Sequence, residues 1–70
     1  MADRQRVPGR HEVVLLWESG KVSCVRVTRA HNRIEITLAV EGYPIFTRVF
    51  FDHNEAADFA LEKMRAYNGR

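Results

Sequence analysis

The chain of 70 residues contains one cysteine, Cys24, and therefore cannot form an internal disulfide or a metal site built from several thiolates. Its longest uninterrupted apolar run covers residues 13–17, which is far too short to span a bilayer. Internal repeats and low-complexity tracts are absent from the sequence. These absences exclude a disulfide scaffold, and we expect no membrane partner.

The first ten residues also lack an apolar run that could serve as a secretory signal. We therefore expect the chain to reside in the reducing cytoplasm. The same segment holds four charged residues, a proline and a glycine without periodicity, which predicts a flexible arm over residues 1–10. Residues 11–70 are then expected to form a single small domain.

The composition, 46% apolar and 29% charged residues, is typical of an ordinary globular domain. A domain of this length lies near the lower limit of what folds on one hydrophobic core. Without a disulfide, such a core supplies about 3–5 kcal/mol of stability. Pairing with a second copy is therefore an expected source of additional stability.

Four short runs rich in β-branched and aromatic residues predict four strands. The runs cover residues 12–18, 21–30, 33–40 and 45–51, and they are separated by short segments of turn-forming residues. The third run has the clearest alternation, because Ile34, Ile36, Leu38 and Val40 alternate with smaller or polar residues.

The period of the apolar residues changes to that of a helix after residue 51. Asp52 is a good N-cap, Glu55 stands where a capping box requires it, and Gly69 stands where a C-cap glycine belongs. The residues at helical spacing are Ala56, Ala57, Ala60, Leu61, Met64 and Tyr67. The predicted fold is α+β, a four-stranded antiparallel β-meander with one C-terminal α-helix packed on one face.

Short turns fix the register of a hairpin and thereby the side of the sheet on which each residue lies. We place the three turns at Ser19 and Gly20, at His31 and Asn32, and at Gly42 and Tyr43. The resulting cross-strand pairs include Val14 with Val25, Val25 with Leu38, and Leu38 with Thr47. Since a bulge near the first turn would exchange the two sides of strand 12–18, the register of that strand is left open.

With this register the helix covers an aliphatic side of the sheet. The other side is left to a partner or, as the alternative, to the arm over residues 1–10 folding back with Val7 and Pro8 as its apolar cover. The side expected under the helix contains Val14, Leu16, Val25, Val27, Ile34, Ile36, Leu38, Val40, Ile45, Val49 and Phe51. An exposed apolar patch of roughly 300–600 Å² usually has a purpose. We therefore hypothesise a homodimer formed through the uncovered face or an edge of the sheet, with an interface made of Leu15, Trp17, Val22, Cys24, Phe46 and Phe50.

A second hypothesis is nucleic-acid binding, in which aromatic rings on an open sheet stack on bases and arginines contact phosphates. Its predicted contacts are Arg26, Arg48, Phe46 and Phe50. The stretch from Phe51 to Ala57 resembles the start of a helix in small integrase-arm DNA-binding domains, through an aromatic-Asp-x-x-Glu-Ala-Ala pattern. Capping chemistry accounts for the same residues, and the strand count of those domains differs.

No spacing in the chain is typical of a catalytic, cofactor-binding or metal-binding site. The three histidines fall near the arm, in a hairpin turn and at a helix start, so none shares a site with another. Cys24 is expected beside Leu15 and Ala39, where a thiol stays protonated and inert. We therefore expect a non-enzymatic interaction module.

Overall fold

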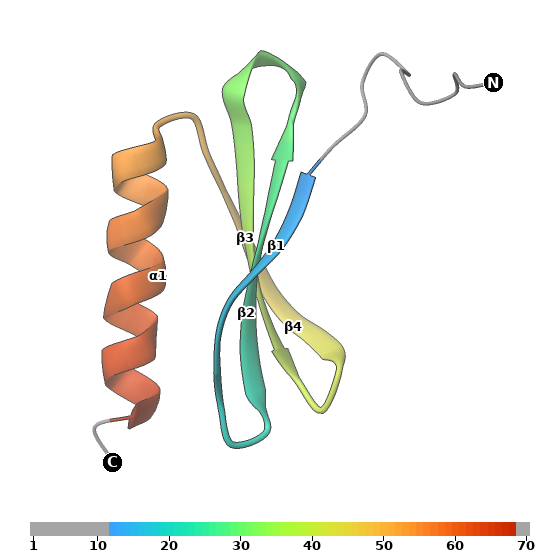
Figure 1. Cartoon of the computed structure of the whole chain (residues 1–70), viewed down its shortest axis with the longest axis vertical. Coiled ribbons are helices and arrows are strands. Elements are labelled where there is room, and N and C mark those ends of the chain that lie inside the picture. The colour runs from blue at the N-terminus through green and yellow to red at the C-terminus, as the bar shows by residue number, and fades with distance from the viewer. Residues whose placement is uncertain (1–11, 69–70) are drawn as a thin grey trace, which may run out of the picture.

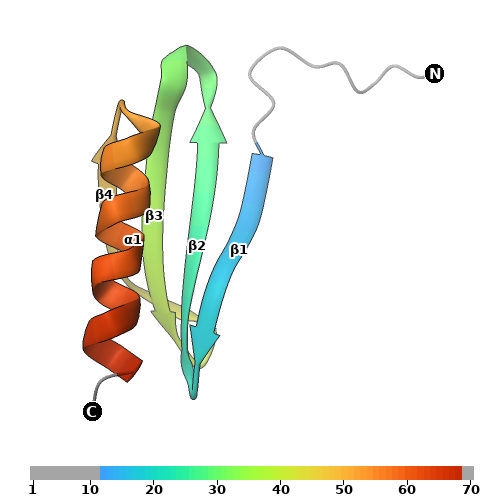
Figure 2. The same cartoon turned by 60° about the vertical axis from the view of Figure 1, so that its left-hand side comes forward.

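The computed structural model describes residues 12–68, and these form four β-strands, one short 3-10 helix and one α-helix. In chain order they are β1 (Glu12–Ser19), β2 (Val22–Arg29), η2 (Ala30–Asn32), β3 (Arg33–Val40), β4 (Tyr43–Phe50) and α1 (His53–Asn68). The strands are antiparallel and lie in the order β1-β2-β3-β4, and α1 packs on one side of the twisted sheet (Figures 1 and 2). The predicted α+β meander is confirmed. The predicted arm over residues 1–10 and the C-cap at Gly69 lie outside the described residues.

Helix α1 begins at the predicted N-cap. The Asp52 carboxylate oxygen Oδ1 accepts hydrogen bonds from the backbone N–H groups of Asn54, at 2.7 Å, and Glu55, at 3.2 Å. The buried side chains of the helix are Ala56, Phe59 and Ala60. Phe59 was not assigned to the apolar side from its spacing, yet it lies at the centre of that side because it follows Ala56 by three positions.

Each of the three connections differs by one residue from the turn predicted for it. The first turn is formed by Gly20 and Lys21, and the third by Glu41 and Gly42. Glu41 and Gly42 both have positive φ, at 53° and 86°, as a two-residue type I′ hairpin turn requires. The middle connection is the three-residue segment η2, which is one residue longer than the predicted turn.

The displaced turns make the predicted cross-strand pairs wrong by one residue. Val25 pairs with Leu15 and with Thr37, and Leu38 pairs with Phe46. A one-residue shift moves every side chain of a strand to the other side of the sheet. Relative to β3, strands β2 and β4 therefore direct toward α1 the side chains that were predicted to point away from it. The register of β1 is displaced twice relative to β3, once at the first turn and once at η2, and the two displacements cancel. Leu15 therefore lies away from α1 as predicted.

Both edge strands contain an irregularity in their pairing. In β1 the register shifts between Leu15 and Trp17, which brings Trp17 opposite Cys24 on the side of α1. In β4 the register shifts where Pro44 pairs with Ala39, so that Ile45 is the additional residue. A bulge bends its strand and interrupts the ladder, and proline has no N–H to donate. The bulge explains why Trp17 lies on the opposite side of the sheet from Leu15.

The hydrophobic core lies between α1 and the inner strands. Its buried residues are Cys24, Ile34, Ile36, Leu38, Ala56, Phe59 and Ala60, with Leu16, Trp17 and Phe50 packed against them. The Trp17 indole N–H donates a hydrogen bond of 3.0 Å to the backbone carbonyl of Ala60. Near the end of α1, the Ser19 hydroxyl donates to the side-chain carbonyl of Asn68. These two contacts join the middle and the C-terminal end of the helix to β1.

Candidate self-association surface

The side of the sheet away from α1 is called the open face here. Because side chains alternate along a strand and Cys24, Ile34, Ile36 and Leu38 point toward α1, their neighbours point away from it. The open face contains Val13, Leu15, Val25, Val27, Glu35, Thr37, Ala39, Thr47 and Val49. No described element covers this side of the sheet (Figure 1).

Apolar side chains dominate the open face and reach both of its edges. Val13 is 60% exposed and Leu15 is 54% exposed on β1, and Val49 is 40% exposed on β4. Val25 and Val27 lie between them, half-buried by their neighbours. Pairing arranges these residues in two rows across the sheet, one through Val13, Val27, Glu35 and Val49, and one through Leu15, Val25, Thr37 and Thr47. The four apolar side chains on β1 and β2 adjoin one another, and Glu35 separates them from Val49. Contiguous exposed apolar surface marks interaction sites in monomeric domains.

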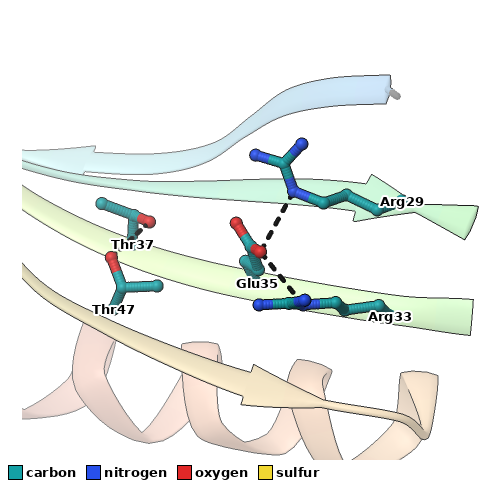
Figure 3. A network of polar contacts seen from close by, with 5 residues as sticks. All are labelled: Arg29, Arg33, Glu35, Thr37 and Thr47. Atoms are coloured by element: carbon teal, nitrogen blue, oxygen red, sulfur yellow. Dashed lines mark hydrogen bonds and ion pairs between the residues drawn. The ribbon is translucent and has the colours of Figure 1, made fainter. Parts of the chain in front are cut away.

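The polar groups in the middle of the open face bond to each other. The hydroxyl groups of Thr37 and Thr47 are 2.9 Å apart, which is a hydrogen-bond distance (Figure 3). The two residues face each other directly across β3 and β4. One hydroxyl donates this hydrogen bond and the other accepts it, so each has one protein partner.

Three charged side chains of the open face, Arg29, Arg33 and Glu35, form a cluster at the end near η2. One carboxylate oxygen of Glu35 lies 3.0 Å from Arg29 Nε and 3.2 Å from Arg33 Nε. The Glu35 side chain is only 16% exposed, since the two guanidinium groups flank it (Figure 3). This cluster joins β2 to β3 and carries one positive charge in excess.

The structure does not bring the predicted interface residues together on an open surface. Of that set only Leu15 belongs to the open face. Cys24 is fully buried, Trp17 and Phe50 pack against the core, and the Phe46 ring centroid lies 5.9 Å from that of Phe59. Val22 pairs with Val40, which also lies on the side of α1. The side assignments of Trp17, Val22, Cys24, Phe46 and Phe50 were wrong because of the shifted turns and the bulge in β1.

The residues predicted to contact nucleic acid do share one side of the sheet, but it is the side of α1. The Phe50 ring packs on Phe59 with their centroids 5.3 Å apart, so it is not free to stack on a base. The Arg48 guanidinium lies 5.5 Å from the centroids of Phe50 and Phe59. Arg26 lies 3.7 Å from a carboxylate oxygen of Glu12. Of the two predicted aromatic rings, Phe46 is 44% exposed and Phe50 is packed against the core, and nucleic-acid binding stays a prediction.

Within residues 12–68 the structure offers little for a reaction or a small ligand. This part of the chain has no pocket and no group of three or more His, Cys, Asp or Glu side chains suited to a metal ion. Burial raises the pKa of the Cys24 thiol, which disfavours the nucleophilic thiolate. No helix of the described residues is long and apolar enough to cross a membrane.

Sequence reasoning placed Val25, Val27 and Val49 under the helix and missed their position on the open face. The signal that could have placed Val49 is the Glu41 and Gly42 pair, whereas the side of Val25 and Val27 depends on the length of η2. A turn with glycine in its second position fits a type I′ hairpin and fixes the pairing of Val40 with Tyr43. Comparison with known proteins finds no match, whether to the model of a protein family, to a curated protein or to a solved structure.

Proposed function

We propose that this chain is a non-enzymatic interaction module that self-associates through its open face. Two copies pack sheet against sheet, and the two helices lie on the outer sides of the resulting four-layer assembly. The observation that supports the proposal most directly is an apolar sheet face whose central polar groups, Thr37 and Thr47, bond to each other.

Covering this face has a favourable energetic balance. Each fully buried apolar side chain of the size of valine or leucine contributes roughly 1.5–3 kcal/mol. A buried polar group without a partner costs about 1–3 kcal/mol, and the threonine pair avoids this cost because its hydroxyls bond within one copy. Glu35 is likewise compensated by two arginines before any partner arrives. Each of these central polar groups therefore keeps at least one protein partner when the open face is desolvated.

The face is a better candidate for the contact than either edge of the sheet. Proteins protect edge strands from pairing with other chains by means of bulges and prolines. Strand β1 has a register shift between Leu15 and Trp17, and β4 has one beside Pro44. The open face has no comparable protection among the described residues. This difference favours face-to-face packing over a continuous sheet.

The size of the open face suits a small dimer. Each strand has 8 residues. At about 3.3 Å per residue and about 4.8 Å between strands, the sheet projects an area of about 500 Å². Two such faces give about 1,000 Å² before side-chain relief is counted, which is the lower limit expected of a specific interface.

The test compares lysine substitutions at two exposed leucines in the full chain. Leu15 on the open face is 54% exposed, and Leu61 on α1 is 40% exposed. Sedimentation equilibrium over a wide range of protein concentration should show a dimer for the unmodified chain and for Leu61→Lys. Leu15→Lys should be monomeric, because an ammonium group in the contact would be buried without a partner.

Circular dichroism establishes that both variants remain folded, and Val49→Lys provides a second open-face variant if Leu15→Lys does not fold. A monomer at every concentration for the unmodified chain would refute the proposal. Equal dimerisation of all the variants would also refute it, since the contact would then lie elsewhere.

A further inference from the structure

The two ends of the open face carry opposite charge. At the end near η2, Arg29 and Arg33 share a single carboxylate of Glu35, so a positive charge remains in excess. At the other end, Glu18 pairs with Ser23, and Ser23 pairs with Ala39 on the open face. Glu18 is exposed, and no basic group among residues 12–68 lies within 4 Å of its carboxylate.

These opposite charges cannot neutralise each other within one copy. Ser23 and Arg29 lie six positions apart on β2, which corresponds to about 20 Å at about 3.3 Å per residue. This separation is about twice the Debye length at physiological ionic strength. Among residues 12–68 no other charge compensates either end, and a partner that presents the opposite arrangement would do so.

Two two-fold arrangements bring a pair of open faces together with their strands aligned, as in an aligned sheet sandwich. If the axis runs parallel to the strands, the arginine cluster of one copy lies over the same cluster of the other, and like charges meet. If the axis runs across the strands in the plane of the interface, the strands of the two copies run in opposite directions. The arginine end of one copy then lies over the glutamate end of the other.

We propose that the second copy docks in this reversed orientation, so that Glu18 of each copy pairs with Arg29 of the other. The proposal rests on the self-association proposed above. Two-fold symmetry makes the contact occur twice in each dimer. Only Nε of Arg29 bonds to Glu35, and its two terminal nitrogens point away from that carboxylate (Figure 3).

The same axis gives a consistent apolar contact. It passes between the row that contains Val25 and the row that contains Val27, midway between the two charged ends. Val27 of one copy then lies over Val25 of the other, and Val13 lies over Leu15. Aligned sheets pack about 10 Å apart, which long arginine and glutamate side chains at the rim can bridge.

The test is a charge exchange in the full chain, measured by sedimentation equilibrium at low salt. Glu18→Arg and Arg29→Glu should each weaken dimerisation about five- to fiftyfold, because each puts like charges together twice in the dimer. The double variant Glu18→Arg with Arg29→Glu should dimerise within about threefold of the unmodified chain. Lys21→Glu is the control for Arg29→Glu, since it makes the same change in net charge in an exposed turn.

The outcomes separate the two proposals. A dimer that both single variants leave unchanged, or that the double variant does not restore, overturns the reversed orientation and leaves self-association intact. A monomeric unmodified chain overturns both. If Arg29→Glu fails to fold beside Glu35, the neutral pair Glu18→Gln and Arg29→Gln replaces it. Each neutral variant should then reduce the salt dependence of dimerisation, and an unchanged salt dependence refutes the orientation.

Discussion

The two faces of this sheet differ in whether their polar groups have hydrogen-bond partners. On the side of α1, Arg26 Nε and Thr28 Oγ1 are buried without a hydrogen-bond partner among the described residues. On the open face, which no described element covers, each threonine hydroxyl and the Glu35 carboxylate has a partner. A face that remains in water has no need of such pairing, because water satisfies exposed polar groups. The comparison therefore indicates that the open face is suited to being covered.

The largest expected effect is the difference in unfolding free energy between a substitution beneath α1 and one on the open face. Ile36 is fully buried under α1, so Ile36→Ala should lower the free energy of unfolding by about 2–5 kcal/mol. Val49 is 40% exposed, and Val49→Ala should cost less than about 1 kcal/mol at concentrations where the chain is monomeric. Urea unfolding measures both values.

Protein concentration sharpens this first prediction. A folded dimer gains thermal stability as its concentration rises, whereas a monomer does not. The melting temperature of the unmodified chain should rise with concentration, and that of Val49→Ala should rise less. If both melting temperatures are independent of concentration, the open face is not covered by a second copy.

The elements of the fold follow from local patterns that the sequence displays. Asp52 and Glu55 locate the start of α1, and the alternation of residues 34–40 identifies β3 and the side it turns toward the helix. These features depend on neighbours within one element, so the sequence alone is sufficient to predict them.

The assignment of faces depends on turns, and there the sequence is less decisive. The His31 and Asn32 pair could close a two-residue turn, but Ala30 joins them in η2, with positive φ at both His31 and Asn32. One additional residue in a turn moves every side chain of the following strand to the other side of the sheet, although it changes local energies very little. The bulge that moves Trp17 depends on its packing against α1, which no local pattern encodes.

The second prediction concerns the threonine pair on the open face. Thr37→Val leaves the Thr47 hydroxyl without its partner. If a second copy covers the open face, this should weaken the dimer by about 1–3 kcal/mol. The double variant Thr37→Val with Thr47→Val should recover most of the loss, because both polar groups are then gone. In a face that stays open, water replaces the lost partner, and the dissociation constants from sedimentation would show no coupling between the two sites.

The third prediction tests whether Trp17 lies beneath α1 of its own copy and not in the contact between two copies. Trp17→Phe removes the hydrogen bond to the Ala60 carbonyl and should cost about 0.5–1.5 kcal/mol in urea unfolding. Trp17 fluorescence should report a buried indole at every protein concentration, since α1 covers it without a second copy. An emission spectrum that shifts on dimerisation would place Trp17 at the contact and contradict the observed register.

The smallest effect is the pH dependence expected from Cys24, which is fully buried on the covered face. Because burial raises the pKa of the thiol in the folded state, the folded chain keeps its proton at a pH where the unfolded chain loses it. The contribution to stability is complete below the unfolded pKa of about 8.5 and declines above it, by no more than about 1 kcal/mol at pH 9. Cys24→Ala should lower stability at all pH values but lack this decline, so the difference between the two chains should shrink as the pH rises. Parallel stability curves from pH 7 to about pH 9 would show that the thiol exchanges its proton equally well in both states, which a side chain enclosed beneath α1 cannot do.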